Sequence, residues 1–220
     1  SFLPMYKVAS LAAKEVKMVL TGDGADELFA GYDKYRDFFS EDKNSLNEEV
    51  FQNKYLANIS LFDSDSRDSL FSSNLKSQLN SRDSADLLHP LYTKSREMDR
   101  INKALYIDMM LLLPGNNLVK TDRMSMAVSL ENRAPFLDYR MVELAFSMPG
   151  KLKLHRGVTK YIFKKAVTPL IGKKLAYRRK QMFTVPVGNW FKTELFDFCN
   201  DFVQTDWGIL FCWTFDFLSF

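Results

Sequence analysis

Cysteine and histidine are both scarce in this sequence of 220 residues, which contains two of each. Cys199 and Cys212 lack the spacing of zinc ligands and are too few for a disulfide framework. His89 and His155 are too few for a histidine-rich metal centre. We therefore expect reduced thiols and a cytoplasmic protein.

Long apolar runs and a targeting segment are also absent. No stretch approaches the roughly 20 apolar residues of a membrane span, and residues 1–13 lack a charged start followed by an apolar run. The net charge is only +3, which suits an anionic ligand such as a nucleotide but argues weakly for nucleic acid. Nucleic-acid binding through the basic run 173–180 would predict a steep salt dependence. We expect neither nucleic acid nor a membrane as a partner.

Apolar residues are plentiful, at 46% of the chain with 19 Phe and 9 Tyr, so a packed core is expected and disorder is excluded. Residues 5–12 show helical spacing, and residues 16–20 form a short apolar run that predicts a buried strand. The turn 21–24 breaks this strand, and residues 28–39 then place apolar side chains on one face of a second helix. Helix, strand, glycine turn and helix together indicate an α/β unit of the parallel-sheet kind.

The rest of the chain predicts helices. Residues 42–95 are rich in Ser, Asn and Asp and indicate short helices and loops. A helix from residue 98 onward is expected to end at Pro114-Gly115. Further helices are predicted at 117–128, after Asp138 as an N-cap, and at 162–170. The chain should therefore be predominantly helical with one clear strand.

The turn after the strand carries the residues best suited to chemistry. Gly22 and Gly24 permit positive φ and a close approach of the backbone to a ligand. Asp23, Asp26 and Glu27 offer hard oxygen ligands for Mg²⁺, and the start of a helix favours an anion such as phosphate. Ligands of open α/β sheets bind beyond the carboxyl ends of strands, where this turn would lie. The same residues also suit an ordinary glycine turn with acidic helix caps, and spacing alone leaves both interpretations open.

Four blocks of the chain, in order, resemble signatures of the glutamine-hydrolysing asparagine synthetase family. The signature SG(E/D)GxDELFxGY is similar to residues 21–32, and DRxSMA is similar to residues 120–127. LExRxPFLD is similar to residues 130–138, and R.KQGFxVP is similar to residues 177–186. The segment 157–161 also fits. Four blocks in order are far more specific than any one of them.

The resemblance implies roles for nine residues. The ATP site would include Thr21, Gly22 and Gly24. Asp23 would take part in adenylate formation, Asp26 would bind magnesium, and Lys180 would reach the pyrophosphate. Arg123, Glu131 and Arg133 would shape the pocket for aspartate. From the residues alone, Lys180 also fits a solvated basic run, and Glu131 with Arg133 fits a surface pair.

The resemblance also implies a fold and a reaction. The fold would be part of an adenine-nucleotide hydrolase-like (PP-loop ATP pyrophosphatase) α/β domain. The parent enzyme would convert aspartate to asparagine through β-aspartyl-AMP, using ATP, Mg²⁺ and ammonia that an N-terminal glutaminase domain releases from glutamine. A homodimer is possible for such a parent.

Departures from the family pattern set the expected limits of this chain. The phosphate-binding Ser-Gly-Gly loop and the glutaminase half have no counterpart, and Met182 replaces a glycine beside Lys180. We expect a partial synthetase domain at 1–195, an atypical aromatic-rich tail at 196–220, and no activity from the chain alone. The alternatives are a related synthetase that acts on another carboxylate, and a non-catalytic helical binding module.

Overall fold

The computed structural model describes residues 2–40, 46–79, 85–180 and 185–204. The chain divides into two compact units. The larger comprises residues 1–58 and 85–183, and the smaller comprises residues 59–84 and 184–220. All nine residues to which the sequence assigns a role lie in the larger unit. The predicted division at residue 195 stays a prediction.

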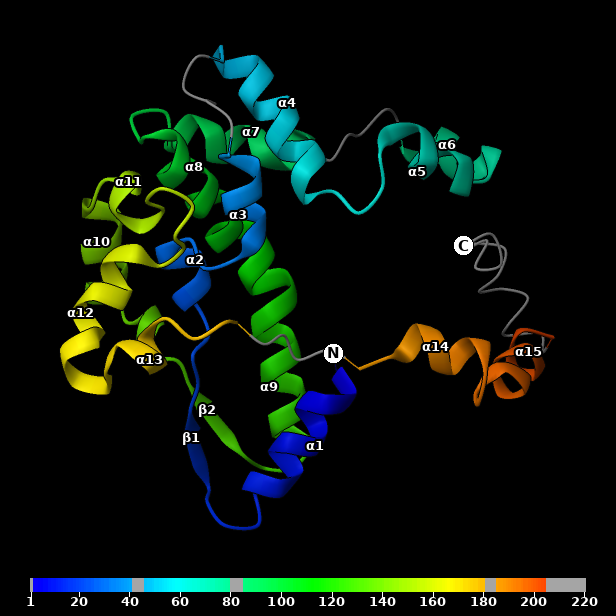
Figure 1. Ribbon diagram of the computed structural model, residues 1–220. Helices are drawn as coiled ribbons and strands as arrows, with labels where there is room; N and C mark the ends of the chain where they lie inside the picture. The colour runs from blue at the N-terminus through cyan, green and yellow to red at the C-terminus, as the bar shows by residue number, and fades with distance from the viewer. Residues whose placement is uncertain (1, 41–45, 80–84, 181–184, 205–220) are drawn as a thin grey trace. The chain divides into compact units, whose positions relative to one another are not determined.

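The described residues are mostly helical, as the sequence predicts (Figure 1). The larger unit contains, in chain order, α1 (Phe2–Ala12), β1 (Met18–Leu20), α2 (Ala25–Phe29), α3 (Asp33–Phe38), α4 (Glu48–Ile59), α7 (Ala85–Lys94), α8 (Arg100–Ile107), η1 (Asp108–Leu118), α9 (Val119–Met126), β2 (Glu131–Arg133), η2 (Pro135–Leu137), α10 (Tyr139–Ser147), α11 (Gly150–Lys153), α12 (Tyr161–Ile171) and α13 (Lys173–Ala176). The smaller unit contains α5 (Ser64–Leu70), α6 (Ser73–Leu79), α14 (Val187–Lys192) and α15 (Phe196–Gln204).

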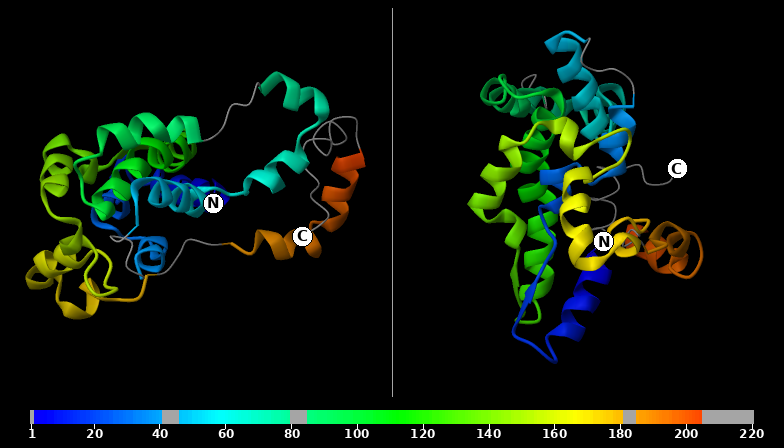
Figure 2. Two further views of the ribbon diagram at one scale, coloured as in Figure 1. Left: turned by 90° about the horizontal axis from the view of Figure 1, so that it is seen from above. Right: turned by 60° about the vertical axis from the view of Figure 1, so that its left-hand side comes forward.

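The sheet consists of two parallel strands in the described part of the chain. β1 pairs with β2, and Leu20 lies opposite Arg133 at their carboxyl ends. Helix α1 packs against α9 beside the two strands (Figures 1 and 2). The α/β class is confirmed, whereas the finer assignment to the adenine-nucleotide hydrolase-like type stays a prediction. Because parallel strands end at the same edge, the turn after β1 and the loop after β2 are neighbours.

One expectation about the strands is wrong. β1 is not buried, since Met18 is 41% exposed and Leu20 is 69% exposed. Within the described ranges β1 pairs with β2 on one side only, so it lies at an edge of the sheet. The one clear strand expected at residues 16–20 is present as β1. The described residues contain a second strand, β2, whose Glu-Asn-Arg lacks the apolar pattern by which strands are recognised.

The helix expected over residues 28–39 is also wrong, because it is broken into α2 and α3. Ala30 adopts left-handed backbone angles (φ 56°, ψ 55°), and Tyr32 is extended (φ −82°, ψ 145°). Left-handed backbone angles at a non-glycine residue cost free energy, and this conformation persists only where the surrounding structure holds it. The break turns the chain at Gly31 and allows Tyr32 to face back toward α2.

Pro114-Gly115 does not end a helix, contrary to expectation. Helical backbone continues from α8 through the π-helix η1 into α9. Proline has no N–H and its ring clashes with the carbonyl four residues earlier in an α-helix. A π-helix bonds five residues back instead of four, so Pro114 interrupts a different pattern. Asn117 lies near the end of η1 and faces α2.

The core of the larger unit surrounds α2 and α3. One cluster of buried side chains joins Ala30, Tyr35, Leu105 and Leu154. A second joins Leu28, Phe29 and Ala145, and the ring of Phe29 lies 5.3 Å from that of Phe163 in α12. Two other predictions are confirmed, namely α12 and the N-cap of α10, where Asp138 accepts a hydrogen bond from the backbone of Arg140. The packing of Phe29 against Ala145 and Phe163 fixes α2 between α10 and α12.

Lys153 is a buried amine without a hydrogen-bond partner in the described part of the chain. Its exposed fraction is 0%, and its Nζ lies 4.5 Å from the centre of the Phe146 ring. Burial lowers the pKa of Lys153 from 10.5 to about 8, opposed in part by the charge of Asp99. The protonated amine therefore opposes folding at neutral pH, because a buried charge loses its hydration.

Replacing Lys153 with methionine is expected to stabilise the protein by about 2 kcal/mol at pH 7, since the charge is removed and the apolar stem is kept. In the unchanged protein, both folded and unfolded states hold the proton below pH 8. Between pH 8 and 10.5 only the unfolded state holds it, so folding stability rises with pH, by about 3 kcal/mol in total. Urea unfolding from pH 7 to 10.5 checks both effects.

The matched control is Lys151→Met, because Lys151 is exposed on the same short helix α11. This control should leave the pH dependence unchanged. A Lys153→Met protein that keeps the full rise in stability between pH 8 and 10.5 would show that another group causes it.

Candidate functional site

The turn that follows β1 is held by hydrogen bonds on both sides. The backbone N–H of Thr21 donates to the carbonyl of Arg133 at 2.8 Å, which ties the turn to the end of β2. The hydroxyl of Thr21 donates to the Asp23 carboxylate at 2.8 Å. Gly22 is exposed and has open space where a side chain would begin. The turn thus lies at the carboxyl edge of the sheet, as the sequence predicts, with Asp23 half-buried.

Gly24 ends the turn and begins α2. Its φ is +86°, and a Cβ at this position would lie 2.2 Å from Cδ2 of Leu137. Glycine is therefore required both by the backbone and by the neighbouring side chain. The helix that follows has only five residues, so few peptide dipoles add up at its start. The anion attraction expected from this helix is accordingly small.

Asp26 is the centre of the site. Its Oδ1 lies 3.0 Å from Nζ of Lys160 and 3.0 Å from Nζ of Lys180. The three side chains come from α2, from the start of α12 and from the segment after α13, and Asp26 is 21% exposed. Two ammonium groups share one carboxylate, so the cluster carries a net positive charge. Such a cluster can bind an anion with several charges, such as a phosphate chain.

Lys160 was not recognised as a site residue from the sequence. It has a left-handed backbone (φ 51°), and its N–H donates to the carbonyl of Phe29 at 3.1 Å. Its main chain therefore holds the end of α2 while its side chain holds Asp26 near the beginning. A Cβ on Gly31 would meet Asp26 Oδ1 at 1.9 Å and Cε of Lys160 at 2.2 Å. The segment 157–161, which fits the family, was the available signal.

Tyr32 joins the acidic turn to the π-helix. Its hydroxyl donates to Glu27 at 2.7 Å, and the side-chain amide of Asn117 donates to both Glu27 and the Tyr32 oxygen. Burial, and then the charge of Glu27, raise the pKa of Tyr32 far above its usual value. The phenol therefore stays neutral. Nζ of Lys180 lies 4.4 Å from the centre of its ring, so Tyr32 is more than the core residue that its helical spacing indicates.

The other predicted residues lie apart from this cluster. Arg123 is exposed on α9. Glu131 and Arg133 form an exposed ion pair on β2, with 2.8 Å between Arg133 Nε and Glu131 Oε1. Among the contacts of the described residues, none joins these three side chains to Asp26 or Lys180. Their roles in a pocket for aspartate stay predictions, whereas Asp26 and Lys180 are brought together.

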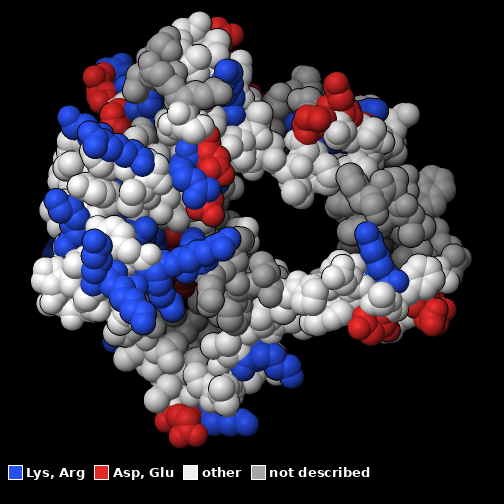
Figure 3. Space-filling model, viewed as in Figure 1, with Lys and Arg blue, Asp and Glu red and all other residues white. Residues whose placement is uncertain are grey.

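Basic side chains gather on the face over α12 and α13 (Figure 3). Lys164, in α12, has its pKa lowered by burial and by the charge of Lys160. Lys180 belongs to the same basic run 173–180, but it is held by Asp26 rather than pointing freely into solvent. This contact favours the interpretation of Lys180 as a site residue over that of a solvated charge.

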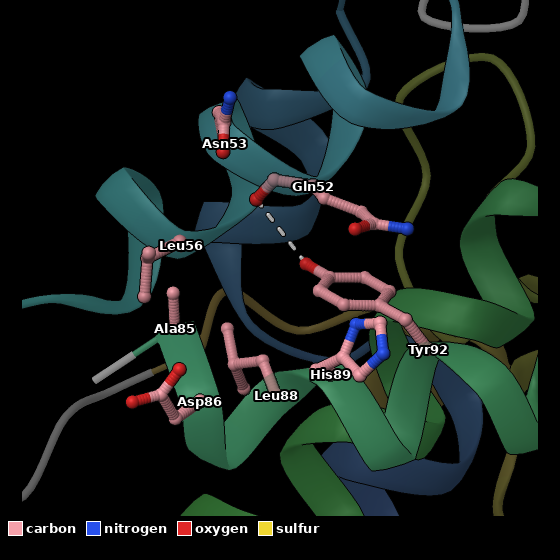
Figure 4. A pocket seen from close by; sticks show the side chains of 8 residues that line it. All are labelled: Gln52, Asn53, Leu56, Ala85, Asp86, Leu88, His89 and Tyr92. Atoms are coloured by element: carbon pink, nitrogen blue, oxygen red, sulfur yellow. Dashed lines mark hydrogen bonds between the residues drawn. The ribbon is translucent and has the colours of Figure 1, made fainter. Parts of the chain in front are cut away.

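A separate pocket of about 200 Å³ lies between α4 and α7. It is lined by Gln52, Asn53, Leu56, Ala85, Asp86, Leu88, His89 and Tyr92 (Figure 4). The Tyr92 hydroxyl donates to the carbonyl of Gln52 at 3.2 Å across it. None of the nine predicted residues lines this pocket, so it is distinct from the cluster around Asp26.

The comparison with protein families decides what the chain is. The family model described as asparagine synthase matches residues 1–207. The chain belongs to the asparagine synthase family. Among the helices of the described ranges, none is long and apolar enough to cross a membrane. No solved structure matches the chain.

Curated relatives agree with the family assignment. The chain is 31% identical to the glutamine-hydrolyzing asparagine synthetase 1 of Bacillus subtilis, over 92% of this chain and 36% of the relative. It is 31% identical to asparagine synthetase 3 of the same organism, over 82% of this chain and 30% of the relative. The asparagine synthetase of Gallus gallus is 27% identical over 50% of this chain and 18% of the relative. The chain thus spans about a third of the length of the first of these relatives.

Proposed function

We propose that this chain supplies the pyrophosphate-binding part of an ATP-dependent synthetase that converts aspartate to asparagine. The observation that carries the proposal is the meeting of Lys160 and Lys180 at Asp26, next to the turn after β1. The family assignment supports the reaction type, a ligation driven by ATP. Thr21, Gly22 and Gly24 would then line the nucleotide site, and Asp23 would face the adenylate.

The two lysines give this site its proposed chemistry. Forming an acyl adenylate releases pyrophosphate, so negative charge accumulates on the leaving group. Ammonium groups fixed beforehand near that charge stabilise it without the reorganisation that water would need. Asp26 holds both lysines at 3.0 Å. Lys180 is the more exposed of the two, at 42% against 23%, and is the better placed to follow the leaving group.

Magnesium is the proposed metal, with Asp26 as its ligand and Asp23 nearby. The described residues contain no group of three or more acidic, His or Cys side chains that could hold a metal. Mg²⁺ is often held by one or two carboxylates together with substrate phosphates and water. Asp26 would hold a metal of that kind together with the phosphates of a nucleotide, and the metal would supply positive charge against them.

The remaining proposals follow from the family. The amide nitrogen would be ammonia released from glutamine by an N-terminal glutaminase domain, since the Bacillus subtilis relative is named as glutamine-hydrolyzing. Arg123, Glu131 and Arg133 would contribute to the aspartate pocket. The chain would act in the cytoplasm, with ATP, aspartate and ammonia as partners and with a homodimer as its possible assembly.

Aspartate-dependent release of pyrophosphate tests the proposed function. The assay uses a full-length hybrid in which this chain replaces the matching segment of the Bacillus subtilis relative, supplied with ATP, Mg²⁺ and ammonium. We expect release that requires aspartate and yields asparagine. Release with another carboxylic acid but none with aspartate would reject the asparagine assignment and favour a related synthetase. No release with any acid would favour a non-catalytic module.

Replacing either lysine of the cluster is expected to weaken pyrophosphate binding about tenfold, because a hydrogen bond to a charged group contributes roughly 1.5 kcal/mol or more. The affinity is measured on this chain by ³¹P NMR titration with inorganic pyrophosphate, using Lys160→Ala and Lys180→Ala. Lys174→Ala is the matched control, since Lys174 is exposed in α13 on the same basic run. An equal loss with Lys174→Ala would indicate general charge attraction instead of a site.

A further inference from the structure

Four side chains form one hydrogen-bonded network that includes the hydroxyl of Tyr32. Tyr32 donates to Glu27 Oε1 at 2.7 Å. Nδ2 of Asn117 lies 3.0 Å from the Tyr32 oxygen and 3.2 Å from Glu27 Oε1. Nζ of Lys120 lies 3.2 Å from Oδ1 of Asn117. Since lysine can only donate, it fixes the amide oxygen toward itself and the amide nitrogen toward Tyr32 and Glu27.

These bonds hold the tyrosine in one position. Glu27 is 3% exposed and accepts the phenol proton, while Asn117 donates to the phenol oxygen. The hydroxyl thus has one donor and one acceptor partner, both in fixed directions. A tyrosine held at its hydroxyl and at its backbone keeps its ring in a defined place.

The ring of Tyr32 in turn contacts Lys180. The 4.4 Å between the ring centre and the Lys180 Nζ is within the range of a cation–π interaction. Lys180 lies in a segment without helix or strand, so its backbone constrains it weakly. Its ammonium position therefore depends on two contacts, the Asp26 carboxylate and the Tyr32 ring.

We propose that Asn117, in the π-helix η1, is a positioning residue for Lys180 and acts through Tyr32. Leucine at this position has similar size but cannot donate, so the phenol would lose one of its two anchors. The wide turns of a π-helix often occur at functional sites, and here they place the Asn117 amide against α2. The catalytic consequence rests on the proposed function, whereas the positioning itself does not.

The test measures how fast the two lysines react with an acetylating reagent, by mass spectrometry of this chain. A lysine whose amine is held against a carboxylate and an aromatic ring is less accessible to the reagent than a free one, and it therefore reacts slowly. Asn117→Leu is expected to speed acetylation of Lys180 about threefold, in line with the loss of one partly exposed cation–π contact. Lys160 is the internal standard, since Asp26 holds it and no contact joins it to Tyr32 among the described residues.

Three more variants sharpen this result. Tyr32→Phe keeps the ring and removes both hydrogen bonds of the hydroxyl, so it should speed acetylation of Lys180 at least as much as Asn117→Leu. The double variant should be no faster than Tyr32→Phe. Asn116→Leu is the matched control, because Asn116 is an exposed neighbour on η1, and it should change nothing. A Lys180 rate that is unchanged in Asn117→Leu, a faster rate in the double variant than in Tyr32→Phe, or an equal rise at Lys160 would each overturn the proposal.

The functional consequence is measured separately. In the hybrid enzyme, Asn117→Leu should lower kcat for pyrophosphate release about threefold, in proportion to the loss of Lys180 placement, without changing the KM for aspartate. If the hybrid is inactive with every acid while acetylation of Lys180 changes as expected, the proposed function fails and the positioning role stands. If the hybrid is active and neither kcat nor Lys180 acetylation responds to Asn117→Leu, the positioning role fails alone.

Discussion

Replacing Gly24 with alanine is expected to destabilise the protein by about 3 kcal/mol. The left-handed backbone at φ +86° costs an alanine roughly 1–2 kcal/mol. The new Cβ would lie 2.2 Å from Cδ2 and 2.8 Å from Cγ of Leu137, and such overpacking costs typically 1–3 kcal/mol. Leu137 lies half-buried in η2, so movement of its side chain can relieve part of this clash.

Gly22→Ala is the matched control for this prediction. A Cβ on Gly22 meets nothing within 4 Å, and its backbone is outside the left-handed region. We expect a change of less than about 0.5 kcal/mol, as for other exposed positions. Urea unfolding of both variants gives the comparison. Equal losses at the two positions would mean that the turn tolerates any backbone and that Leu137 does not pack against Gly24.

The two glycines show how far sequence reasoning reaches at the site. A glycine-rich turn after a short apolar run was sufficient to predict where the site lies, and both glycines carry the same signal. The structure distinguishes them, because Gly24 alone of the two has a positive φ, and a Cβ there would also meet Leu137, 113 positions further along the chain. A contact of that kind leaves no trace in the local pattern.

The local elements were predicted well where their cause is local. The apolar periods of α1 and α12 and the cap at Asp138 depend on residues within about one or two helical turns, and each is present. β2 was missed because a strand made of Glu131, Asn132 and Arg133 is defined by its pairing with β1. The π-helix was missed for a similar reason, since Pro114-Gly115 is an ordinary stop signal when tertiary packing does not override it.

The pairing of charges in the site could not follow from spacing. Asp26 and Lys180 are 154 positions apart, and only the resemblance of two motifs to one family brought them together. Lys160 lies in the segment 157–161, which fits the family, but nothing local separates it from other Lys residues as a site residue. Asn117 lies in none of the matching blocks. Their importance comes from where α12 and η1 pack against α2, which is a property of the tertiary structure.

Asp108 links α3 to the beginning of the π-helix. Its Oδ2 lies 2.6 Å from Nζ of Lys34 and accepts a hydrogen bond from the hydroxyl of Tyr35 at 2.5 Å. Asp108 is 1% exposed and Tyr35 is fully buried. Burial and the charge of Asp108 raise the pKa of Tyr35 well above its usual value, so the phenol is a permanent donor. The pair joins the helix that follows Tyr32 to the helix that carries Asn117.

Asp108→Ala is expected to destabilise the protein by about 3 kcal/mol. The buried hydroxyl of Tyr35 would lose its acceptor, which costs roughly 1–3 kcal/mol, and Lys34 would lose its counter-ion. Lys34 is 28% exposed and can be partly hydrated. The loss of its ion pair with Asp108 therefore adds little more than 1 kcal/mol to the destabilisation. Asp108→Asn keeps the volume and an acceptor oxygen, and should cost about half as much. Urea unfolding at pH 7 checks the order of the two variants.

The same substitution connects stability with the site. Tyr32 immediately precedes α3, and Asn117 is carried by the π-helix that Asp108 begins. If the contacts of Asp108 with α3 keep Tyr32 and Asn117 at hydrogen-bonding distance, Asp108→Asn should speed acetylation of Lys180 while the protein remains folded. The acetylation rate of Lys160 should stay unchanged. A destabilised Asp108→Asn protein with normal Lys180 reactivity would mean that the hydrogen bonds of Tyr32 keep their geometry without the contacts of Asp108. Asp108 would then contribute only to folding stability.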